Sequence, residues 1–194
     1  MRRRGLTLLE MVLAVALLAI LLTTVFFIFE TSAEAFVTSG AESDIRNQAS
    51  VAKEAIKRAG RETDWDSLTV APEAISLLTH RDADGHVVRD DQGNPVWQAY
   101  LVFFQQGSEL HLRRLPVAIP STVEPIEEHD FGSGPQPLST YLSGGRVLAR
   151  QLDQAEFLAP VPGQAVFRLI FSIPRSRNRQ DHRLEIRAGL ATRN

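Results

Sequence analysis

The sequence has no cysteine among its 194 residues. Disulfide bonds, zinc–thiolate sites, iron–sulfur clusters and thiol catalysis are therefore excluded. An excess of one charge sign is lacking as well, because 21 lysine and arginine residues face 23 aspartate and glutamate residues, for a formal net charge of −2. The overall charge therefore gives no reason to expect nucleic acid as a partner.

Catalytic signatures are also missing. No Gly-x-Ser-x-Gly, His-Glu-x-x-His or phosphate-binding loop occurs. The histidines are scattered along the chain, at His80, His86, His111, His129 and His182. We therefore expect no enzymatic activity, no metal and no cofactor. A signal-anchored periplasmic enzyme that uses an acidic loop is the alternative from another functional class.

Residues that break helices are rare near the N-terminus. Proline is absent from residues 6–59, and Gly40 is the one glycine of residues 30–59. This pattern predicts one helix from about Leu6 to Ala59, roughly 80 Å long at 1.5 Å per residue. Gly60 is expected to cap it after a basic last turn. The alternative is a membrane anchor followed by a separate amphipathic helix, with a break near Gly40.

A long apolar run extends from Met11 to Phe29 and is interrupted only by Thr23 and Thr24. In a helix, about 19 residues cover about 30 Å, the thickness of a bilayer's hydrocarbon core. Three arginines precede the run, so the positive-inside rule predicts a single-pass protein with a cytoplasmic N-terminus and a periplasmic C-terminal part. A secretory signal cleaved near Ala33 and Ala35 is the alternative.

A carboxylate, Glu10, stands at the start of this run. A carboxylate that lies deep in a membrane costs about 2.5–3.5 kcal/mol, so such residues usually have a partner. The simplest interpretation is an interfacial glutamate that reaches back to the lipid headgroups or to Arg4.

The string Arg4-Gly5-Leu6-Thr7-Leu8-Leu9-Glu10 resembles the class III signal of type IV pilins and type II secretion pseudopilins. The resemblance implies that a prepilin peptidase cuts after Gly5 and N-methylates Leu6, and that the apolar run stays in the mature protein. It also implies that Glu10 pairs with the free N-terminus of a neighbouring subunit and sets the axial register of a filament. Most members of the family have phenylalanine where this chain has Leu6.

The resemblance and the pattern together divide the chain into four parts. Residues 1–5 are a cytoplasmic leader, and residues 6–29 form the transmembrane and filament-core half of the helix. Residues 30–60 form its amphipathic half, and residues 61–194 form a periplasmic β-rich head. The residues predicted to contact lipid or neighbouring helices are Met11, Val12, Leu13, Val15, Leu17, Leu18, Ile20, Leu21, Leu22, Val25, Phe26, Phe27, Ile28 and Phe29.

The amphipathic half has one narrow apolar face, with residues spaced by four and three. We expect this face to pack on the head; it consists of Ile45, Ala49, Ala52, Ile56 and Ala59. Phe36 and Val37 are expected to face neighbouring helices in a filament. The predicted fold is therefore α+β and pilin-like, with the second half of a long helix on an antiparallel β-sheet.

The head reads as strands separated by turns. The expected strands are 67–71, 74–80, 96–105, 110–113, either 146–152 or 155–158, 165–173 and 183–190. Residues 116–145 are rich in proline and glycine and are expected to form a long surface loop, with a turn of helix near residues 139–142. This layout is similar to J-type minor pseudopilins and shares its plan with W-type minor pilins.

Three further groups are weighed as binding sites. The stretch Asp82-Ala83-Asp84-Gly85 is similar to the start of a calcium loop, but no third oxygen ligand follows, so a hairpin turn is favoured. An acidic loop could bind a metal, but it is more simply interpreted as a solvated loop. A basic hairpin could contact DNA, but without aromatic residues between the arginines it is more simply interpreted as a polar surface or a subunit contact. The acidic loop holds Glu124, Glu127, Glu128, His129 and Asp130, and the basic hairpin holds Arg175, Arg177, Arg179, Arg183 and Arg187.

These features predict a non-catalytic minor pseudopilin that helps to initiate or cap a filament built from the inner membrane. The partners that the resemblance implies are other minor and major pilins or pseudopilins, the prepilin peptidase and N-methyltransferase, the inner-membrane assembly platform and the lipid bilayer. A minor pilin of a type IV pilus, serving adhesion, motility or DNA uptake, is the alternative within the same class.

Overall fold

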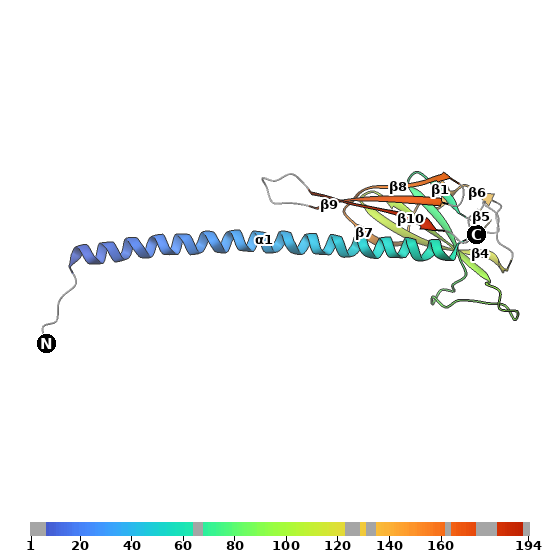
Figure 1. Cartoon of the computed structure of the whole chain (residues 1–194), viewed down its shortest axis with the longest axis horizontal. Coiled ribbons are helices and arrows are strands. Elements are labelled where there is room, and N and C mark those ends of the chain that lie inside the picture. Colours follow the sequence, from blue (N-terminus) through green and yellow to red (C-terminus); the bar gives the residue numbers. More distant parts are fainter. Residues whose placement is uncertain are drawn as a thin grey trace.

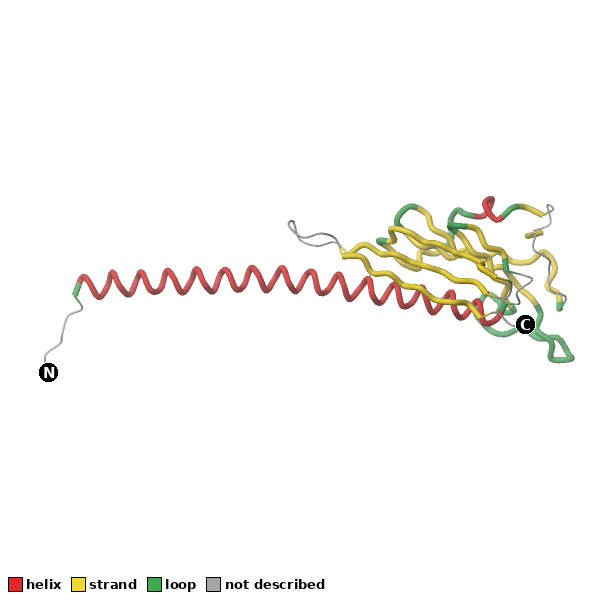
Figure 2. Tube along the Cα trace, turned by 45° about the horizontal axis from the view of Figure 1, so that its top comes forward, coloured by secondary structure: helices red, strands yellow, loops and turns green. Residues whose placement is uncertain are grey.

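The structure is a computed structural model that describes residues 7–63, 68–122, 129–130, 135–161, 164–173 and 182–191. One long helix carries a β-rich head beside its C-terminal part (Figure 1). In a second view the described strands again lie along only this part of the helix (Figure 2). The long N-terminal helix and the antiparallel strands confirm the expected α+β, pilin-like fold.

Helix α1 runs without a break from Leu8 to Glu62, over 55 residues. At 1.5 Å per residue it is about 82 Å long. The predicted continuous helix is confirmed, and the alternative break near Gly40 is not present. Gly40 lies on an open part of the helix, with no atom within 4 Å of where a Cβ atom would stand.

The predicted cap at Gly60 is wrong, because α1 continues through it to Glu62. Gly60 is buried against the head, and a Cβ atom there would lie 2.9 Å from Cδ2 of Leu190. Glycine therefore serves close packing here, and the helix ends where Thr63 turns into extended backbone. The Thr63 hydroxyl lies 2.6 Å from the Leu78 carbonyl and 3.0 Å from the Ala59 carbonyl, and it ties this end to the head.

The head contains two larger antiparallel sheets in the part of the chain that the structure describes. Five strands form the first, in the order β1-β2-β3-β4-β7: β1 (Thr69–Ala71), β2 (Ala74–Thr79), β3 (Trp97–Gln106), β4 (Glu109–Ser121) and β7 (Arg146–Arg150). Three form the second, in the order β10-β9-β8: β8 (Leu152–Val161), β9 (Gln164–Ile173) and β10 (His182–Ala191). A short pair, β5 (His129–Asp130) and β6 (Pro135–Gln136), is separate.

The main core lies between α1 and both larger sheets. The five residues predicted to face the head, Ile45, Ala49, Ala52, Ile56 and Ala59, are all buried. They pack with one face of β9, where Phe167, Leu169, Phe171 and Ile173 are buried as expected from alternation. Small alanines allow the helix to approach the sheets closely. The apolar face of the amphipathic half of α1 is therefore buried within the same chain, against its own head.

A second core covers the opposite face of the five-stranded sheet. It includes Tyr100, Phe104 and Leu115, and it is closed by Leu138 of the 3₁₀ helix η2 (Leu138–Tyr141). The predicted surface loop 116–145 is therefore wrong for residues 116–121, which extend β4, and for Leu138, which is buried. The expected turn of helix is confirmed as η2.

The two larger sheets join at Gln105 and at the junction of β7 and β8. The sequence left 146–152 and 155–158 as alternatives, and both regions form strands, separated by Gln151 in a left-handed conformation (φ 60°). The Gln105 side chain accepts a bond from the Ala155 N–H (2.7 Å) and donates to the Asp153 carbonyl (3.2 Å). Between the two sheets, the Gln105 side-chain amide thus forms hydrogen bonds to the backbone of β8 that a neighbouring strand would otherwise form.

Candidate assembly site on the N-terminal helix

The bare part of α1 exposes an apolar surface long enough to cross a membrane. Among the described residues, α1 is the one helix with the length and composition of a membrane span. Every large apolar side chain from Met11 to Phe29 is more than half exposed, and this includes all the residues predicted to contact lipid or neighbouring helices. Such a surface is stable in lipid or against other helices and not in water.

The polar groups within the apolar run are satisfied inside the helix. The Thr23 hydroxyl donates to the Ala19 carbonyl (2.8 Å), and the Thr24 hydroxyl donates to the Ile20 carbonyl (2.9 Å). In lipid an unpaired hydroxyl would be costly, because no water is present to bind it. The two threonines therefore do not prevent this segment from lying in a membrane.

Glu10 forms a capping box with Thr7 at the start of α1. One Glu10 oxygen, Oε2, accepts from the Thr7 N–H (2.8 Å) and from the Thr7 hydroxyl (3.0 Å). The Thr7 hydroxyl oxygen in turn accepts from the Glu10 N–H (3.3 Å). The carboxylate thus satisfies two donors of Thr7 through one of its oxygens, Oε2.

Sequence reasoning missed Thr7, although a signal for it was present. A Ser or Thr followed three residues later by Glu, just before an apolar run, is the signature of a capping box. Thr7 and Glu10 have this spacing. The predicted cleavage and methylation positions, Gly5 and Leu6, lie outside the described residues, so their roles stay predictions.

Between the apolar run and Ile45, none of the residues of α1 is buried in the part of the chain that the structure describes. Phe36 is 83% exposed and Val37 is 72% exposed, although both are large and apolar. Ala41 and Glu42 are half-buried, and the first fully buried residue of α1 is Ile45. The position of Phe36 and Val37 agrees with their predicted contact with neighbouring helices, which stays a prediction.

The stretch with the calcium-loop similarity is the first of two tandem turns, which sequence reasoning also missed. Residues 81–88 and 89–96 share the pattern Arg-Asp-x-x-Gly-x-x-Val. In both turns the arginine donates to the glycine carbonyl, at 2.8 Å for Arg81 and 2.6 Å for Arg89. Both glycines, Gly85 and Gly93, have φ 86°, which favours glycine.

The acidic residues of the tandem turns are occupied by backbone groups. Oδ1 of Asp82 accepts the N–H groups of Asp84 (2.9 Å) and His86 (2.8 Å), and the His86 bond holds the pKa of Asp82 below its ordinary value. The side chains of Asp82, Asp84 and His86 also hold atoms that could bind a metal ion, all within 4.8 Å of one another. The second turn builds the same bonds around Asp90 with Asn94 in place of His86. Hydrogen bonding therefore accounts for the geometry, and the predicted turn is confirmed.

Most residues of the acidic loop and of the basic hairpin lie outside the described part of the chain. Residues 124–128 lie outside the described part of the chain, and so do Arg175, Arg177 and Arg179 of the basic hairpin. The remaining arginines of that group are paired, Arg183 with Asp153 (3.6 Å) and Arg187 with Glu185. Paired arginines on a sheet surface have less positive charge to offer to DNA.

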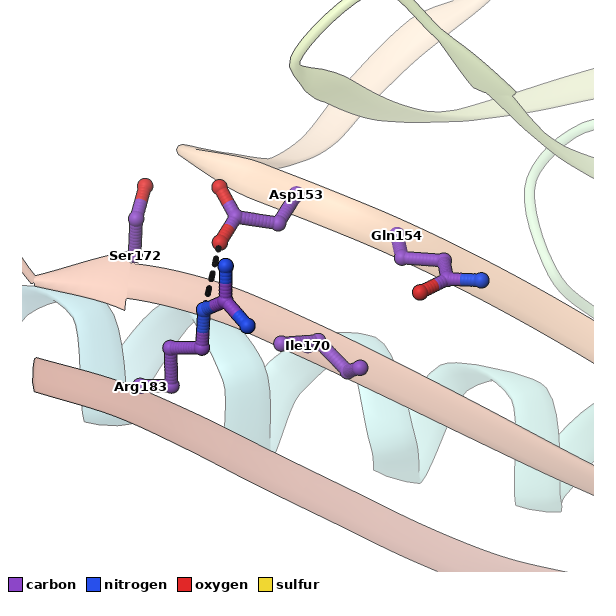
Figure 3. Close-up of a pocket in the computed structure, with 5 residues that line it drawn as sticks. All are labelled: Asp153, Gln154, Ile170, Ser172 and Arg183. Carbon is purple, nitrogen blue, oxygen red and sulfur yellow. Dashed lines mark ion pairs between the residues drawn. The ribbon is translucent and has the colours of Figure 1, made fainter.

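A shallow hollow of about 470 Å³ lies on the outer face of β8, β9 and β10. Figure 3 shows the Asp153–Arg183 ion pair across it, with Gln154, Ile170 and Ser172 alongside. Among these five lining residues, Ser172 is the one hydroxyl, and no histidine or lysine is present to act as its base. These five residues alone therefore do not form a nucleophile–base pair.

Comparison with known families assigns the N-terminal segment. Residues 1–26 match the family model described as the prokaryotic N-terminal methylation motif. The matched residues include Glu10 and most of the apolar run, and they indicate a single-pass, membrane-anchored protein. No curated protein and no solved structure matches the chain. Together with the long N-terminal helix and the antiparallel strands, the motif supports a place for this chain in the type IV pilin and pseudopilin family.

Proposed function

We propose that this protein is a filament subunit whose first-half helix becomes buried among the helices of other subunits. The observation that carries the proposal is the exposed apolar surface from Met11 to Phe29, with one carboxylate, Glu10, at its start. The N-terminal methylation motif implies processing by a prepilin peptidase and assembly with other pilins. In this proposal the peptidase cuts after Gly5, and Leu6 becomes the methylated N-terminus.

The capping box gives Glu10 a partner before assembly. Thr7 supplies two donors to one carboxylate oxygen, which lowers the cost of holding Glu10 near the membrane surface. The other oxygen can then accept the ammonium group of Leu6 from a neighbouring subunit. A buried carboxylate and a buried ammonium are each costly alone, so their pairing favours one axial register over others.

Within the family, we place the protein as a minor pseudopilin that helps to initiate or cap a type II secretion pseudopilus. In this proposal residues 1–5 are a leader, residues 6–29 span the inner membrane with the N-terminus in the cytoplasm, and the head lies in the periplasm. The absence of cysteine supports this choice, because many type IV pilins close their C-terminal region with a disulfide bond. The N-terminal motif supports a type IV pilus equally, so a minor pilin is the second candidate.

The family is generally structural and non-catalytic, and assembly is the activity that we propose here. The direct test is mass spectrometry of the membrane-extracted protein, made with and without a prepilin peptidase. A mature N-terminus at Leu6 that depends on the peptidase supports the proposal. An N-terminus that stays at Met1 in both samples, or one that begins after Ala35, would contradict the proposal.

Function is tested by Glu10→Ala in cells that carry the assembly machinery. The variant is expected to insert in the membrane and to be cleaved, but to be lost from the sheared filament fraction. Glu54→Ala, which removes an exposed carboxylate from the part of α1 beside the head, is the control for loss of charge in the same helix. Equal recovery of the Glu10→Ala variant and the wild type in filaments would contradict the role given to Glu10.

A further inference from the structure

The outer edges of the two larger sheets differ in how they are closed. In the described part of the chain these edges are β1, β7, β8 and β10. Strand β1 has three residues and β7 has five, and the pairing of β7 contains a shift of register. The free side of β8 is bonded, because the Leu152 N–H donates to the Ser108 carbonyl (2.9 Å). The Phe157 N–H likewise donates to the Pro72 carbonyl (3.1 Å). These three edges are therefore short or occupied.

Strand β10 is neither short nor occupied on its free side. It has ten residues and pairs with β9 from His182 to Ala191 without any shift of register. In an antiparallel edge strand, every second residue directs its N–H and C=O groups away from the sheet. Among the described residues, these groups of β10 make no hydrogen bond to an element other than β9. A Cβ atom added at Gly189 would have no atom within 4 Å, so space is open beside the strand.

An edge of this kind is a template for another strand, because its row of donors and acceptors lacks partners. Proteins commonly protect such an edge by keeping it short, by a bulge or by a proline. Strand β10 has none of these three protections. We propose that the free edge of β10 binds an extended segment of another protein, which adds to the three-stranded sheet as a fourth strand.

The outer face of β10 sets the charge of this segment. Arg183, Glu185 and Arg187 are all exposed on it. Glu185 is already paired, with Arg168 of β9 at 2.8 Å and with Arg187. Arg183 reaches Asp153 only at 3.6 Å (Figure 3), and the side chains of Arg183 and Arg187 stay 75% and 66% exposed. An added strand is therefore favoured when it places acidic residues opposite the two arginines, four positions apart on one face.

The inner face of β10 sets the apolar side of the segment. Leu184, Ile186 and Ala188 are half-buried there and pack against the main core. Helix α1 lies behind the strands on this side (Figure 3). Apolar residues on the same face of an added strand would cover the exposed parts of these side chains and extend the core. The occupant is therefore an extended segment with two acidic residues on one face and apolar residues on the other.

A second copy of β10 is a poorer occupant than such a segment. In an antiparallel pair centred on Glu185, the two glutamates lie opposite each other, and each Arg183 lies opposite an Arg187. A parallel pair in register sets every charge against its own copy. Like charges directly opposite each other are destabilising. We therefore assign the edge to a different protein, and this contact requires neither cleavage at Gly5 nor filament assembly.

A designed peptide tests the edge on the full-length protein in detergent. The probe is a capped peptide as long as β10, with valine on one face and threonine on the other. Two glutamates replace threonines four positions apart. One control peptide has lysine in place of both glutamates, and another keeps the glutamates but has N-methyl groups on its central backbone nitrogens. We expect the glutamate peptide to bind roughly ten-fold more tightly than either control peptide.

Charge reversal on the protein provides a matched comparison. The Arg183→Glu and Arg187→Glu double variant should reverse the preference and bind the lysine peptide more tightly. This binding would also show that the variant keeps its sheet. Arg150→Glu changes an arginine of similar exposure (71%) on β7, the edge of the other sheet, and it should leave the preference unchanged.

Hydrogen exchange locates the bound peptide. We expect slower exchange of the β10 amides in the complex and unchanged exchange of the β7 amides. Protection confined to α1 or β8, equal affinity for the glutamate and lysine peptides, or full binding of the N-methylated peptide would overturn the inference. Failure of the glutamate peptide to bind would do so as well. A dimer of the wild type in detergent that the double variant no longer forms would assign the edge to a second copy instead.

Discussion

From Leu8 to Asp44, α1 has no buried residue, whereas from Ile45 to Glu62 one of its faces is completely covered by the head. The backbone is the same unbroken helix in both halves. Ile28 and Ile56 illustrate the difference, because Ile28 is 59% exposed and Ile56 is 0% exposed. The second half, Ile45 to Glu62, has its apolar partners within the chain. The first half, Leu8 to Asp44, is called the bare half below, and its apolar partners must come from lipid or from other subunits.

The largest effect is expected when a core side chain of the second half is truncated. Ile56→Ala should lower the free energy of unfolding by about 3 kcal/mol, because it removes buried methyl groups and leaves a cavity. Ile28→Ala, in the bare half, should leave it unchanged. Urea unfolding of the full-length protein in detergent, followed by the fluorescence of buried Trp97, measures both. Equal shifts in the two variants would remove the distinction between the halves.

Glycine gives a second contrast between the two halves. Gly60→Val should destabilise by about 1–3 kcal/mol, because the added side chain meets Leu190 in a packed region. Gly40→Ala should instead favour the helix by roughly 0.8–1.0 kcal/mol, since open space surrounds Gly40. The same unfolding measurement reports on Gly60, and helix content by circular dichroism reports on Gly40. Tolerance of valine at position 60 would show that α1 and the head are less tightly packed than described.

The capping box should stabilise only the first turn of the bare half. Thr7→Ala removes the hydroxyl that binds the Glu10 N–H, and it should cost about 1 kcal/mol locally. Hydrogen exchange of the first turn should become faster, while exchange in the head stays the same. Thr38→Ala, deep within the helix, is the control. Unchanged exchange near Glu10 would mean that the cap does not hold this end.

The smallest effect concerns the tandem turns, which lie outside both halves of α1. The pKa values of Asp82 and Asp90 are lowered by hydrogen bonds, so their stabilising contribution is present above the ordinary aspartate pKa. It is lost as the pH falls through the lower value in the folded state, below about pH 4. Amide exchange of His86 and Asn94 should rise together there, and Asp82→Asn should remove the pH dependence of the first turn. Independent behaviour of the two wild-type turns would contradict their equivalence.

Much of the fold could be predicted because the spacing of apolar residues along the sequence indicates which face of a helix or strand is buried. The alternation in β9 and the spacing from Ile45 to Ala59 both place apolar residues on one face, and both faces are buried. The cap at Gly60 and the loop at 116–145 were mispredicted for a shared reason. Gly60 and Leu138 are fixed by contacts with distant residues, which local sequence does not report.

Some parts of the candidate site could likewise be predicted from the sequence, and others could not. Glu10 could be singled out because a carboxylate beside an apolar run is costly, and Thr7 could have been found from its spacing. The tandem turns could have been found as a repeat of eight residues. The partners of the bare half could not be derived, because the surface that covers it belongs to other molecules.

The most direct measurement of the central claim is the accessibility of the bare half before and after assembly. Phe36→Cys gives the cysteine-free chain a single thiol at an exposed position of this half, and Ala83→Cys places one on the exposed first tandem turn. Both are labelled with maleimide in membranes and in sheared filaments. The account predicts that position 36 reacts in membranes and becomes protected in filaments, while position 83 reacts in both. Equal labelling of position 36 in filaments and membranes would show that other subunits do not cover the bare half of α1.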